Sequence, residues 1–278
     1  MKKFWEYLKL VRLHNLLLVV GSVFLGGWLE TKDILDPHLI LAAASALLLA
    51  AFGYSHNDFC DQEIDRLNKN HRPLPRGKIE GKAVLILGGI LAVSGVILTW
   101  WVNFYVFGLA LLAVVLLIGY NLRWKKSFLW GNLIVSFLSG GLFIYGALAV
   151  EKLGLVLVPA IFSFLYHCGR EILKDFEDHP ADRQAAARTV PLRMGTEKTL
   201  LVVTLIFFCL MVLVFLPYHL QLFNQRYLVL AALGVDGFLL YILWSLWKDN
   251  SLQNISRLNS LLKLNMYLGL AAILVGRL

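Results

Sequence analysis

Long runs of apolar residues alternate with short polar segments along almost the whole chain. Each run is close to the roughly 20 residues that an α-helix needs to cross a bilayer. The pattern predicts membrane-spanning helices over residues 12–29, 38–57, 83–102, 104–120, 130–150, 155–173, 199–217, 227–247 and 259–277, with a very tight turn near Asn103. We therefore expect an all-α polytopic membrane protein, a bundle of nine transmembrane helices in one integral-membrane domain that covers residues 1–278.

The composition agrees with this pattern. Hydrophobic residues make up 59% of the chain, the mean hydropathy is +0.70 and only 16% of the residues are charged, which excludes an ordinary soluble domain. The first apolar run is too long for the h-region of a signal peptide and lacks a small-residue cleavage pattern, so we expect a retained helix. The three cysteines, Cys60, Cys168 and Cys209, have neither disulfide nor metal spacing.

Basic residues are distributed unevenly over the predicted loops. All but four of the 26 lysines and arginines lie on the side that holds the N-terminus, and the exceptions are Lys32, Lys152, Arg226 and Arg277. Because cytoplasmic loops are enriched in Lys and Arg, we expect a multi-pass protein of the cell (plasma) membrane whose N-terminus faces the cytoplasm. The net charge of +8 then follows from topology and phosphate chemistry, and we expect no nucleic acid partner.

Two of the cytoplasmic loops begin with a repeated acidic sequence. Residues 57–66 read NDFCDQEIDR and residues 174–183 read KDFEDHPADR, with identical residues at five of ten positions. Each copy carries three aspartates at the same spacing and runs into a basic loop that contains proline. The first motif is Asp58, Asp61 and Asp65, and the second motif is Asp175, Asp178 and Asp182. At about 100° per residue, the three carboxylates of a motif fall on one stripe of a helix.

A stripe of three like charges destabilises a bare helix, so each motif is either a solvated helix end or a cation site. The doubling favours the cation site, and carboxylate oxygens suit Mg²⁺ or Ca²⁺. Metal ions can bridge carboxylate and phosphate oxygens while arginine side chains bind the remaining phosphate oxygens bidentately. The candidate phosphate-binding groups on this face are Asn15, Arg66, Arg72, Arg76, Arg123, Lys125, Arg170 and Lys174, and Glu171 extends the second motif by one turn.

Metal-binding carboxylates and cations at the mouth of an apolar helical bundle predict a site for a lipid diphosphate. Metal ions would neutralise the diphosphate and make it a better leaving group. If the lipid is allylic, the apolar bundle can shield the resulting carbocation from water. The apolar helices would hold the polyprenyl tail, and a nucleophilic acceptor would attack the allylic carbon.

The sequences NDFCDQEID and KDFEDHPAD resemble the two aspartate-rich motifs of the UbiA-type intramembrane prenyltransferases, and the resemblance covers essentially the whole chain. It implies Mg²⁺-dependent transfer of an isoprenoid chain from its diphosphate. It also implies that the six aspartates of the two motifs are the catalytic and metal-binding residues. Five further residues match family positions that contact or lie near the diphosphate: Asn57, Arg66, Tyr120, Lys125 and Lys174.

Within that family, the sequences RPLPRG at 72–77 and REILKD at 170–175 are most similar to those of the geranylgeranylglyceryl phosphate geranylgeranyltransferases. The similarity implies a glyceryl-phosphate-type acceptor, whose phosphate Arg72, Arg76, Arg123 or Lys126 could bind. Two departures leave aromatic acceptors (quinone, tocopherol or tetrapyrrole precursors) open. Arg76 stands where a small residue is expected, and HPA follows Asp178.

Two other classes of protein use carboxylates on membrane helices. A divalent-cation transporter would carry them near the middle of the membrane, without interleaved arginines that repel the ion. A CDP-alcohol phosphotransferase would show a different aspartate pattern, which this sequence lacks. Asp236 does lie inside the eighth predicted span, where a carboxylate must face the bundle interior or a wet cavity. The sequence predicts neither its role nor the oligomeric state.

Overall fold

The computed structural model describes residues 2–68 and 72–278, and all regular secondary structure in them is helical. Residues 69–71, in the predicted loop after the first motif, lie outside the described residues. The chain forms two compact units: unit 1 is Met1–Lys125 with Leu142–Leu153, and unit 2 is Lys126–Gly141 with Gly154–Leu278.

Unit 1 contains α1 (Lys2–Val11), α2 (Leu13–Thr31), α3 (Pro37–Cys60), α4 (Gln62–Asn68), α5 (Gly81–Thr99) and α6 (Phe104–Leu122). The short 3-10 helix η1 (Trp124–Lys126) ends at the boundary, and α7 (Trp130–Ala149) begins in unit 2 and ends in unit 1. Unit 2 continues with α8 (Leu157–Glu177), α9 (His179–Gln184), α10 (Val190–Met194), α11 (Thr196–Val214), α12 (Leu216–His219), α13 (Gln225–Val229), the π-helix η2 (Leu230–Asp236), α14 (Gly237–Lys248) and α15 (Leu252–Arg277).

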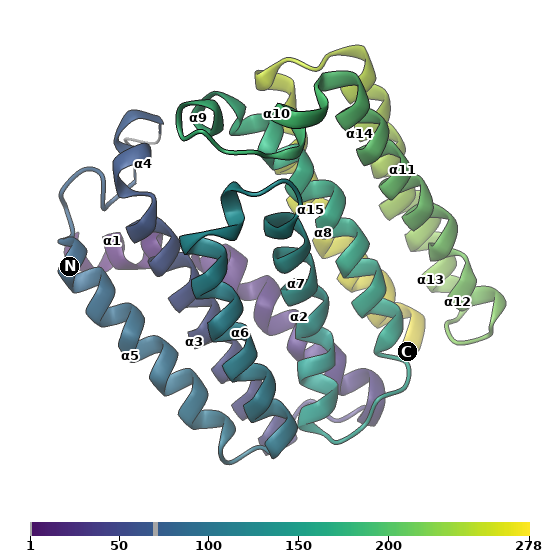
Figure 1. Ribbon diagram of the computed structural model, residues 1–278. Coiled ribbons are helices and arrows are strands. Elements are labelled where there is room, and N and C mark those ends of the chain that lie inside the picture. The colour runs from purple at the N-terminus through teal and green to yellow at the C-terminus, as the bar shows by residue number, and fades with distance from the viewer. Residues whose placement is uncertain (1, 69–71) are drawn as a thin grey trace. The chain divides into compact units, whose positions relative to one another are not determined.

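Helix α3 is the centre of unit 1 and packs against α2, α5 and α6 (Figure 1). Its start is fixed by Asp36, whose carboxylate accepts hydrogen bonds from the backbone N–H groups of His38 and Leu39. Inside the unit, the Ser45 hydroxyl donates to the carbonyl oxygen of Gly95 (2.7 Å) and lies 2.8 Å from the hydroxyl of Tyr145. Such hydrogen bonds join helices in an apolar environment, where surface burial alone gives little association.

Close backbone contacts join α2 to the unit 1 part of α7. A Cβ atom at Gly146 would collide with the carbonyl oxygen of Val23, and one at Gly26 would collide with that of Phe143. Small residues allow helix backbones to approach this closely, as is common between membrane helices.

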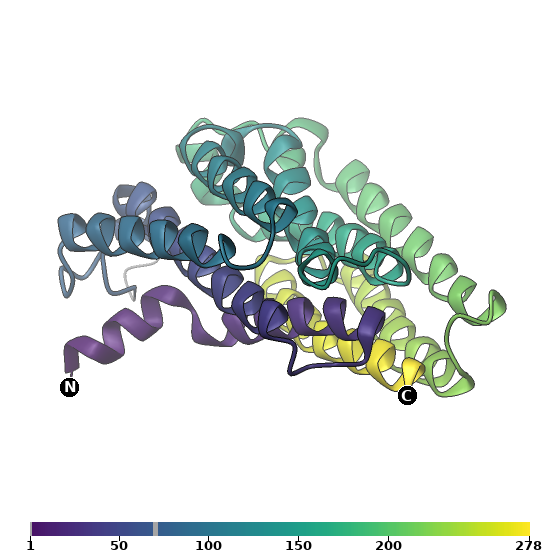
Figure 2. The same ribbon diagram turned by 90° about the horizontal axis from the view of Figure 1, so that it is seen from below.

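Arg12 separates α1 from α2. Its backbone is left-handed (φ 56°, ψ 61°), an uncommon conformation for a residue other than glycine, and the two helices run in different directions (Figures 1 and 2). Leu10, near the end of α1, is fully buried in a small cluster with Leu74, Ile79 and Val84. Helix α1 thus anchors the loop that follows the first motif.

In unit 2, α8 makes its most extensive helix contacts with α11 and α15. The buried hydroxyl of Tyr166 donates to the carbonyl oxygen of Leu262 on α15 (2.7 Å). Gly169, one turn further along α8, lies against the ring of Phe207 on α11. These contacts fix the helix whose end carries the second motif.

The polytopic all-α prediction is confirmed. Eight helical segments of the described chain are long and apolar enough to cross a membrane: Leu13–Thr31, Pro37–Cys60, Gly81–Thr99, Phe104–Leu122, Trp130–Ala149, Thr196–His219, Gln225–Lys248 and Leu252–Arg277. The span predicted over 155–173 forms α8, a helix of 21 residues that carries Arg170, Glu171 and Lys174 near its end. A count of nine spans therefore depends on α8 and stays a prediction.

The segment that contains Asp236 is a π-helix, a local widening that is frequent at functional sites. Asp236 is 5% exposed, and its carboxylate oxygens accept no hydrogen bond from the described residues. Next to it, the amide of Asn265 on α15 donates to the carbonyl oxygen of Val235 (3.1 Å). As predicted, this carboxylate faces the interior.

Candidate active site

The first motif lies at a break between two helices. Helix α3 ends at Cys60, Asp61 has a non-helical conformation (φ −95°, ψ 3°), and α4 begins at Gln62. The helix that carries the predicted stripe of carboxylates is therefore interrupted at Asp61. Even so, Asp61 N–H donates to Asn57 (3.0 Å) and Asp65 N–H donates to Asp61 (2.8 Å), so the i to i+4 spacing of the backbone bonds continues across the break.

The second motif has the same backbone arrangement. Helix α8 ends at Glu177, Asp178 has a non-helical conformation (φ −84°, ψ 0°), and α9 begins at His179. The N–H of Asp178 donates to the carbonyl oxygen of Lys174, and that of Asp182 donates to Asp178, both at 2.9 Å. Each motif thus places one aspartate on a long helix, one at the break and one on a short helix.

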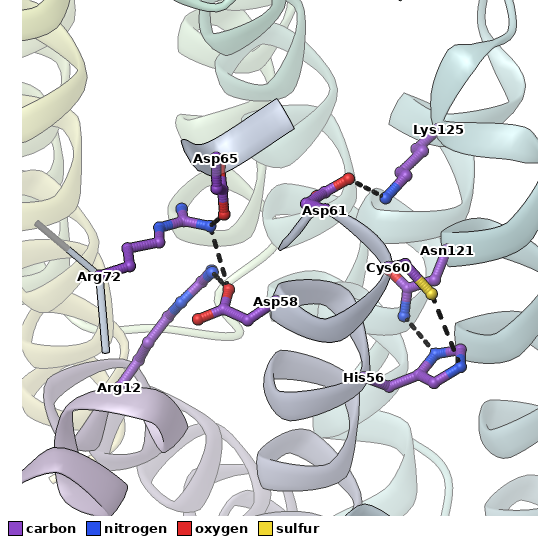
Figure 3. Close-up of polar contacts among 9 residues, drawn as sticks. All are labelled: Arg12, His56, Asp58, Cys60, Asp61, Asp65, Arg72, Asn121 and Lys125. Atoms are coloured by element: carbon purple, nitrogen blue, oxygen red, sulfur yellow. Dashed lines mark hydrogen bonds and ion pairs between the residues drawn. The ribbon is translucent and has the colours of Figure 1, made fainter. Parts of the chain in front are cut away.

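Every carboxylate of the first motif is paired with a cation (Figure 3). Asp58, which is 3% exposed, accepts from Arg12 Nη2 at 2.6 Å and from Arg72 Nη1 at 3.0 Å. The same Arg72 nitrogen lies 2.5 Å from Asp65, which is also buried. Asp61 forms an ion pair with Lys125, just beyond the end of α6.

Neighbouring side chains support these ion pairs. The guanidinium of Arg12 lies over the ring of Tyr54, 5.0 Å from its centroid. His56 Nδ1 lies 2.9 Å from the amide nitrogen of the buried Asn121 on α6 (Figure 3). Asn121 and Lys125 are four residues apart. Two contacts therefore join the end of α3 to the end of α6, one through His56 and Asn121 and one through Asp61 and Lys125.

The second motif is surrounded differently. Asp175 Oδ2 accepts a hydrogen bond from the amide of Asn132 on α7 (2.8 Å), and Asp175 forms no ion pair with any described residue. The two neighbouring cations of α8 bind Glu171 instead, with Arg170 Nη1 at 2.7 Å and Lys174 Nζ at 3.3 Å. Asp175 is therefore held by a neutral group while Glu171 takes the positive charges.

Burial raises the pKa of Asp175, which lies beyond the predicted span 155–173, to about 8. The hydrogen bond from Asn132 and the charge of Lys174 act in the opposite direction, while the charges of Glu171 and Asp182 raise the pKa further. A divalent cation beside this carboxyl group would stabilise its ionised form.

At the end of α8, the carboxylate of Glu177 is bound by α15. Ser256 Oγ donates to one carboxylate oxygen and Asn259 Nδ2 to the other, both at 2.8 Å. Since Glu177 lies directly before Asp178, these bonds fix the helix end at the second motif.

The other predicted site residues lie at the ends of the same helices. Asn15, Asn57 and Tyr120 are half-buried. Three arginines have exposed side chains, namely Arg66, Arg76 and Arg123. Two contacts of the motifs, Arg12 and Asn132, were not predicted as site residues. Both are polar residues beside an apolar run of the sequence. That pattern does not predict which aspartate each of them contacts.

The chemistry of the two motifs fits a hard divalent cation. Aspartate oxygens are the ligands that Mg²⁺ prefers, and the Arg72 nitrogen shows that a positive charge fits between Asp58 and Asp65. Within residues 2–68 and 72–278, no three His, Cys, Asp or Glu side chains are gathered closely enough to hold a metal ion as they stand. A Mg²⁺ ion here would be held by one or two carboxylates together with phosphate or water oxygens.

Comparisons with known proteins point in one direction. Residues 19–268 match the UbiA prenyltransferase family. The chain is 33% identical to a digeranylgeranylglyceryl phosphate synthase of Thermococcus kodakarensis, with 99% of both chains covered. It is 37% identical to the synthase of the same name from Sulfurisphaera tokodaii, over 80% of this chain and 81% of the relative.

Solved structures have the same fold. One, described as digeranylgeranylglyceryl phosphate synthase in membranes, is 32% identical, has a TM-score of 0.79, and is aligned over 100% of this chain and 99% of its own. A UbiA homolog from Archaeoglobus fulgidus bound to GPP and Mg²⁺ has a TM-score of 0.72 at 19% identity, covering 97% and 100% of the two chains. At that identity the second similarity concerns the fold alone.

Proposed function

This chain belongs to the UbiA prenyltransferase family, and from that we propose that it transfers a geranylgeranyl group from its diphosphate to a glyceryl-phosphate-type acceptor. The observation that carries the proposal is the match, over nearly the whole chain, to relatives named digeranylgeranylglyceryl phosphate synthase. The reaction forms an ether bond in membrane lipid synthesis.

The reaction replaces one carbon–oxygen bond by another. The bond between the allylic carbon and the diphosphate breaks, and inorganic diphosphate leaves with the bonding electron pair. The acceptor hydroxyl then forms the ether bond to that carbon and loses its proton. The apolar faces of the helices hold the prenyl chain and exclude the water that would otherwise capture the cationic carbon.

The polar groups of each motif are candidates for binding the metal ions and phosphates of the donor. Carboxylates of Asp58, Asp61, Asp65, Asp175, Asp178 and Asp182 would bind Mg²⁺, which neutralises the diphosphate and makes it a better leaving group. Arg72 and Lys125, already placed beside the first motif, would bind phosphate oxygens, with Asn57, Arg66, Tyr120, Arg170 and Lys174 nearby in sequence. The Mg²⁺-bound Archaeoglobus homolog supports the choice of metal.

An acceptor that carries its own phosphate fits the excess of basic side chains. Arg76 and Arg123 have exposed side chains in basic segments of the same predicted face, so they are candidates for this second phosphate. Arginine binds such dianions bidentately, which a lysine cannot reproduce.

We further propose that the segment 155–173, most of which lies on α8, is the ninth span and that both motifs face the cytoplasm of a plasma-membrane protein. The distribution of basic residues supports this orientation. The chain enters unit 2 at Lys126, returns to unit 1 at Leu142 and leaves it again after Leu153, so neither unit is a contiguous segment. This connectivity supports a single catalytic domain over residues 1–278.

Purified protein in detergent, assayed with geranylgeranyl diphosphate and Mg²⁺, tests the proposal. We expect an ether product with geranylgeranylglyceryl phosphate and none with hydroxybenzoate or a naphthoate. Turnover only with an uncharged aromatic acceptor would rule out the glyceryl-phosphate-type acceptor, but the protein would still be a prenyltransferase.

Variants of the motifs test the site in the same assay. Asp58→Asn and Asp175→Asn should each lower kcat by at least about 100-fold, because each removes a charged ligand from the donor's leaving group. The matched control is Glu63→Gln, an exposed carboxylate beside the first motif, which should retain near-normal turnover.

A further inference from the structure

The two motifs differ in how their negative charge is balanced. The three carboxylates of the first motif are paired with three cations: Arg12, Arg72 and Lys125. A metal ion alone would have to displace these cations from two buried aspartates and the half-buried Asp61, and leave them close together without a counter-ion. Removing one partner of a buried ion pair is strongly unfavourable, so this exchange is costly.

A diphosphate changes that balance. Its oxygens can accept the hydrogen bonds of the displaced guanidinium and ammonium groups, and charge-assisted bonds of this kind are the strongest that such groups make. When metal and diphosphate bind together, the cations can therefore transfer to the phosphate oxygens while the aspartate carboxylates bind the metal. Without the phosphate, the existing ion pairs compete with the metal.

In the second motif, Asp175 forms no ion pair with any described residue. The two neighbouring cations, Arg170 and Lys174, both bind the buried Glu171, and Asp175 accepts a hydrogen bond from the neutral amide of Asn132. A divalent cation can therefore approach Asp175 without displacing an ion-paired partner of that carboxylate.

We infer that the metal sites fill in order: the second motif binds a divalent cation on its own, and the first motif binds one only together with a diphosphate. This inference rests on the proposed function, because it assumes that both motifs bind metal. In this inference Arg12, Arg72 and Lys125 have a common role: their ion pairs with the aspartates of the first motif prevent a free metal ion from binding there.

Direct binding of Mn²⁺ tests the order without measuring turnover. Free Mn²⁺ is counted by electron paramagnetic resonance, with detergent-purified protein, in the absence and presence of inorganic pyrophosphate. Wild type should bind one ion per chain without pyrophosphate and an additional ion with it. Two ions, or none, without pyrophosphate would overturn the inference.

Variants identify which motif binds the first ion. Asp175→Asn should weaken the pyrophosphate-independent binding at least about tenfold, by loss of a charged ligand, whereas Asp58→Asn should leave it within about twofold. The reverse pattern, or equal losses, would contradict the order. If neither variant alters Mn²⁺ binding even with pyrophosphate, the metal role in the proposed function fails as well.

A third variant tests the competition itself. Arg72→Gln removes the shared partner of Asp58 and Asp65, and a second ion should then bind without pyrophosphate. Lys82→Gln, which replaces an exposed lysine in the first turn of α5, is the matched control and should still bind one ion. An unchanged stoichiometry in folded Arg72→Gln protein would exclude these ion pairs as the barrier.

Discussion

Asn132 illustrates how a neutral side chain positions a charged one. Its amide donates to Asp175, and it is itself only 5% exposed. We predict that Asn132→Leu raises the Mg²⁺ concentration for half-maximal activity by about 10- to 100-fold, the usual effect of losing a partner that orients a metal ligand. A Mg²⁺ titration of initial rates measures this.

The same helix offers a control for this substitution. The hydroxyl of Ser139, seven residues from Asn132, donates to the carbonyl oxygen of Val135 on its own helix (2.8 Å). Ser139→Ala should leave the Mg²⁺ dependence unchanged. If both variants respond equally, the effect of Asn132→Leu reflects packing of α7 and not the orientation of Asp175.

At the scale of residues, the sequence predicted the aspartates of the site better than the side chains that contact them. The spacing of the repeated aspartates identified both motifs, and Lys125 was predicted to contact or lie near the diphosphate, without a named aspartate partner. Arg12 pairs with Asp58 across 46 positions. No local pattern encodes such a contact, because it depends on the left-handed turn at Arg12 and on the docking of α1 through Leu10.

Among the elements, the contact between α8 and α15 is the clearest support of the second motif. Asn259 binds the Glu177 carboxylate and is nearly buried. We predict that Asn259→Leu lowers the free energy of unfolding by about 1–3 kcal/mol, because a carboxylate oxygen loses its donor. Thermal unfolding in detergent measures the stability, and the Mg²⁺ requirement should rise at the same time.

Ser260 provides the comparison for that variant. Its exposed hydroxyl donates to the carbonyl oxygen of Ser256 on the same helix (3.1 Å), so Ser260→Ala should change neither stability nor Mg²⁺ dependence. An Asn259→Leu protein that is less stable but has a normal Mg²⁺ requirement would show that this bond serves the fold and not the motif.

The close approach of α2 and α7 makes a second prediction about elements. Gly146→Ala places a methyl group against the carbonyl oxygen of Val23, and backbone atoms cannot rotate away. We expect a loss of about 1–3 kcal/mol, typical of overpacking, seen as a lower Tm. Gly141→Ala on the same helix has open space around its Cβ atom and should be neutral or slightly stabilising.

Helix positions were largely predictable, because long apolar runs leave few other structures in a membrane. The predicted turn near Asn103 is present, and Asn103 caps α6 through its side chain. The breaks at Asp61 and Asp178 were not predicted, since each aspartate spacing is equally compatible with a continuous helix. The π-helix before Gly237 likewise has no signal in the hydrophobic pattern.

For the whole molecule, orientation in the membrane is the property to test. In a background without the three native cysteines, we predict that Glu80→Cys and Gln184→Cys are labelled only from the cytoplasmic side, because both follow basic, motif-bearing segments. Lys152→Cys should be labelled only from outside. Labelling of the first two from opposite sides would contradict the shared orientation of the motifs.

The path of α7 sets the order in which this protein can fold while it is being synthesised. Residues Lys126–Gly141, which belong to unit 2, are synthesised before Leu142–Leu153, the last segment of unit 1. Unit 1 is therefore complete only after a part of unit 2 has left the ribosome. Domains made on the ribosome generally fold from the N-terminal side first. The first half of α7 must therefore wait for Gly154–Leu278, with Asn132 and Ser136, both buried in the finished protein, still without their unit 2 surroundings.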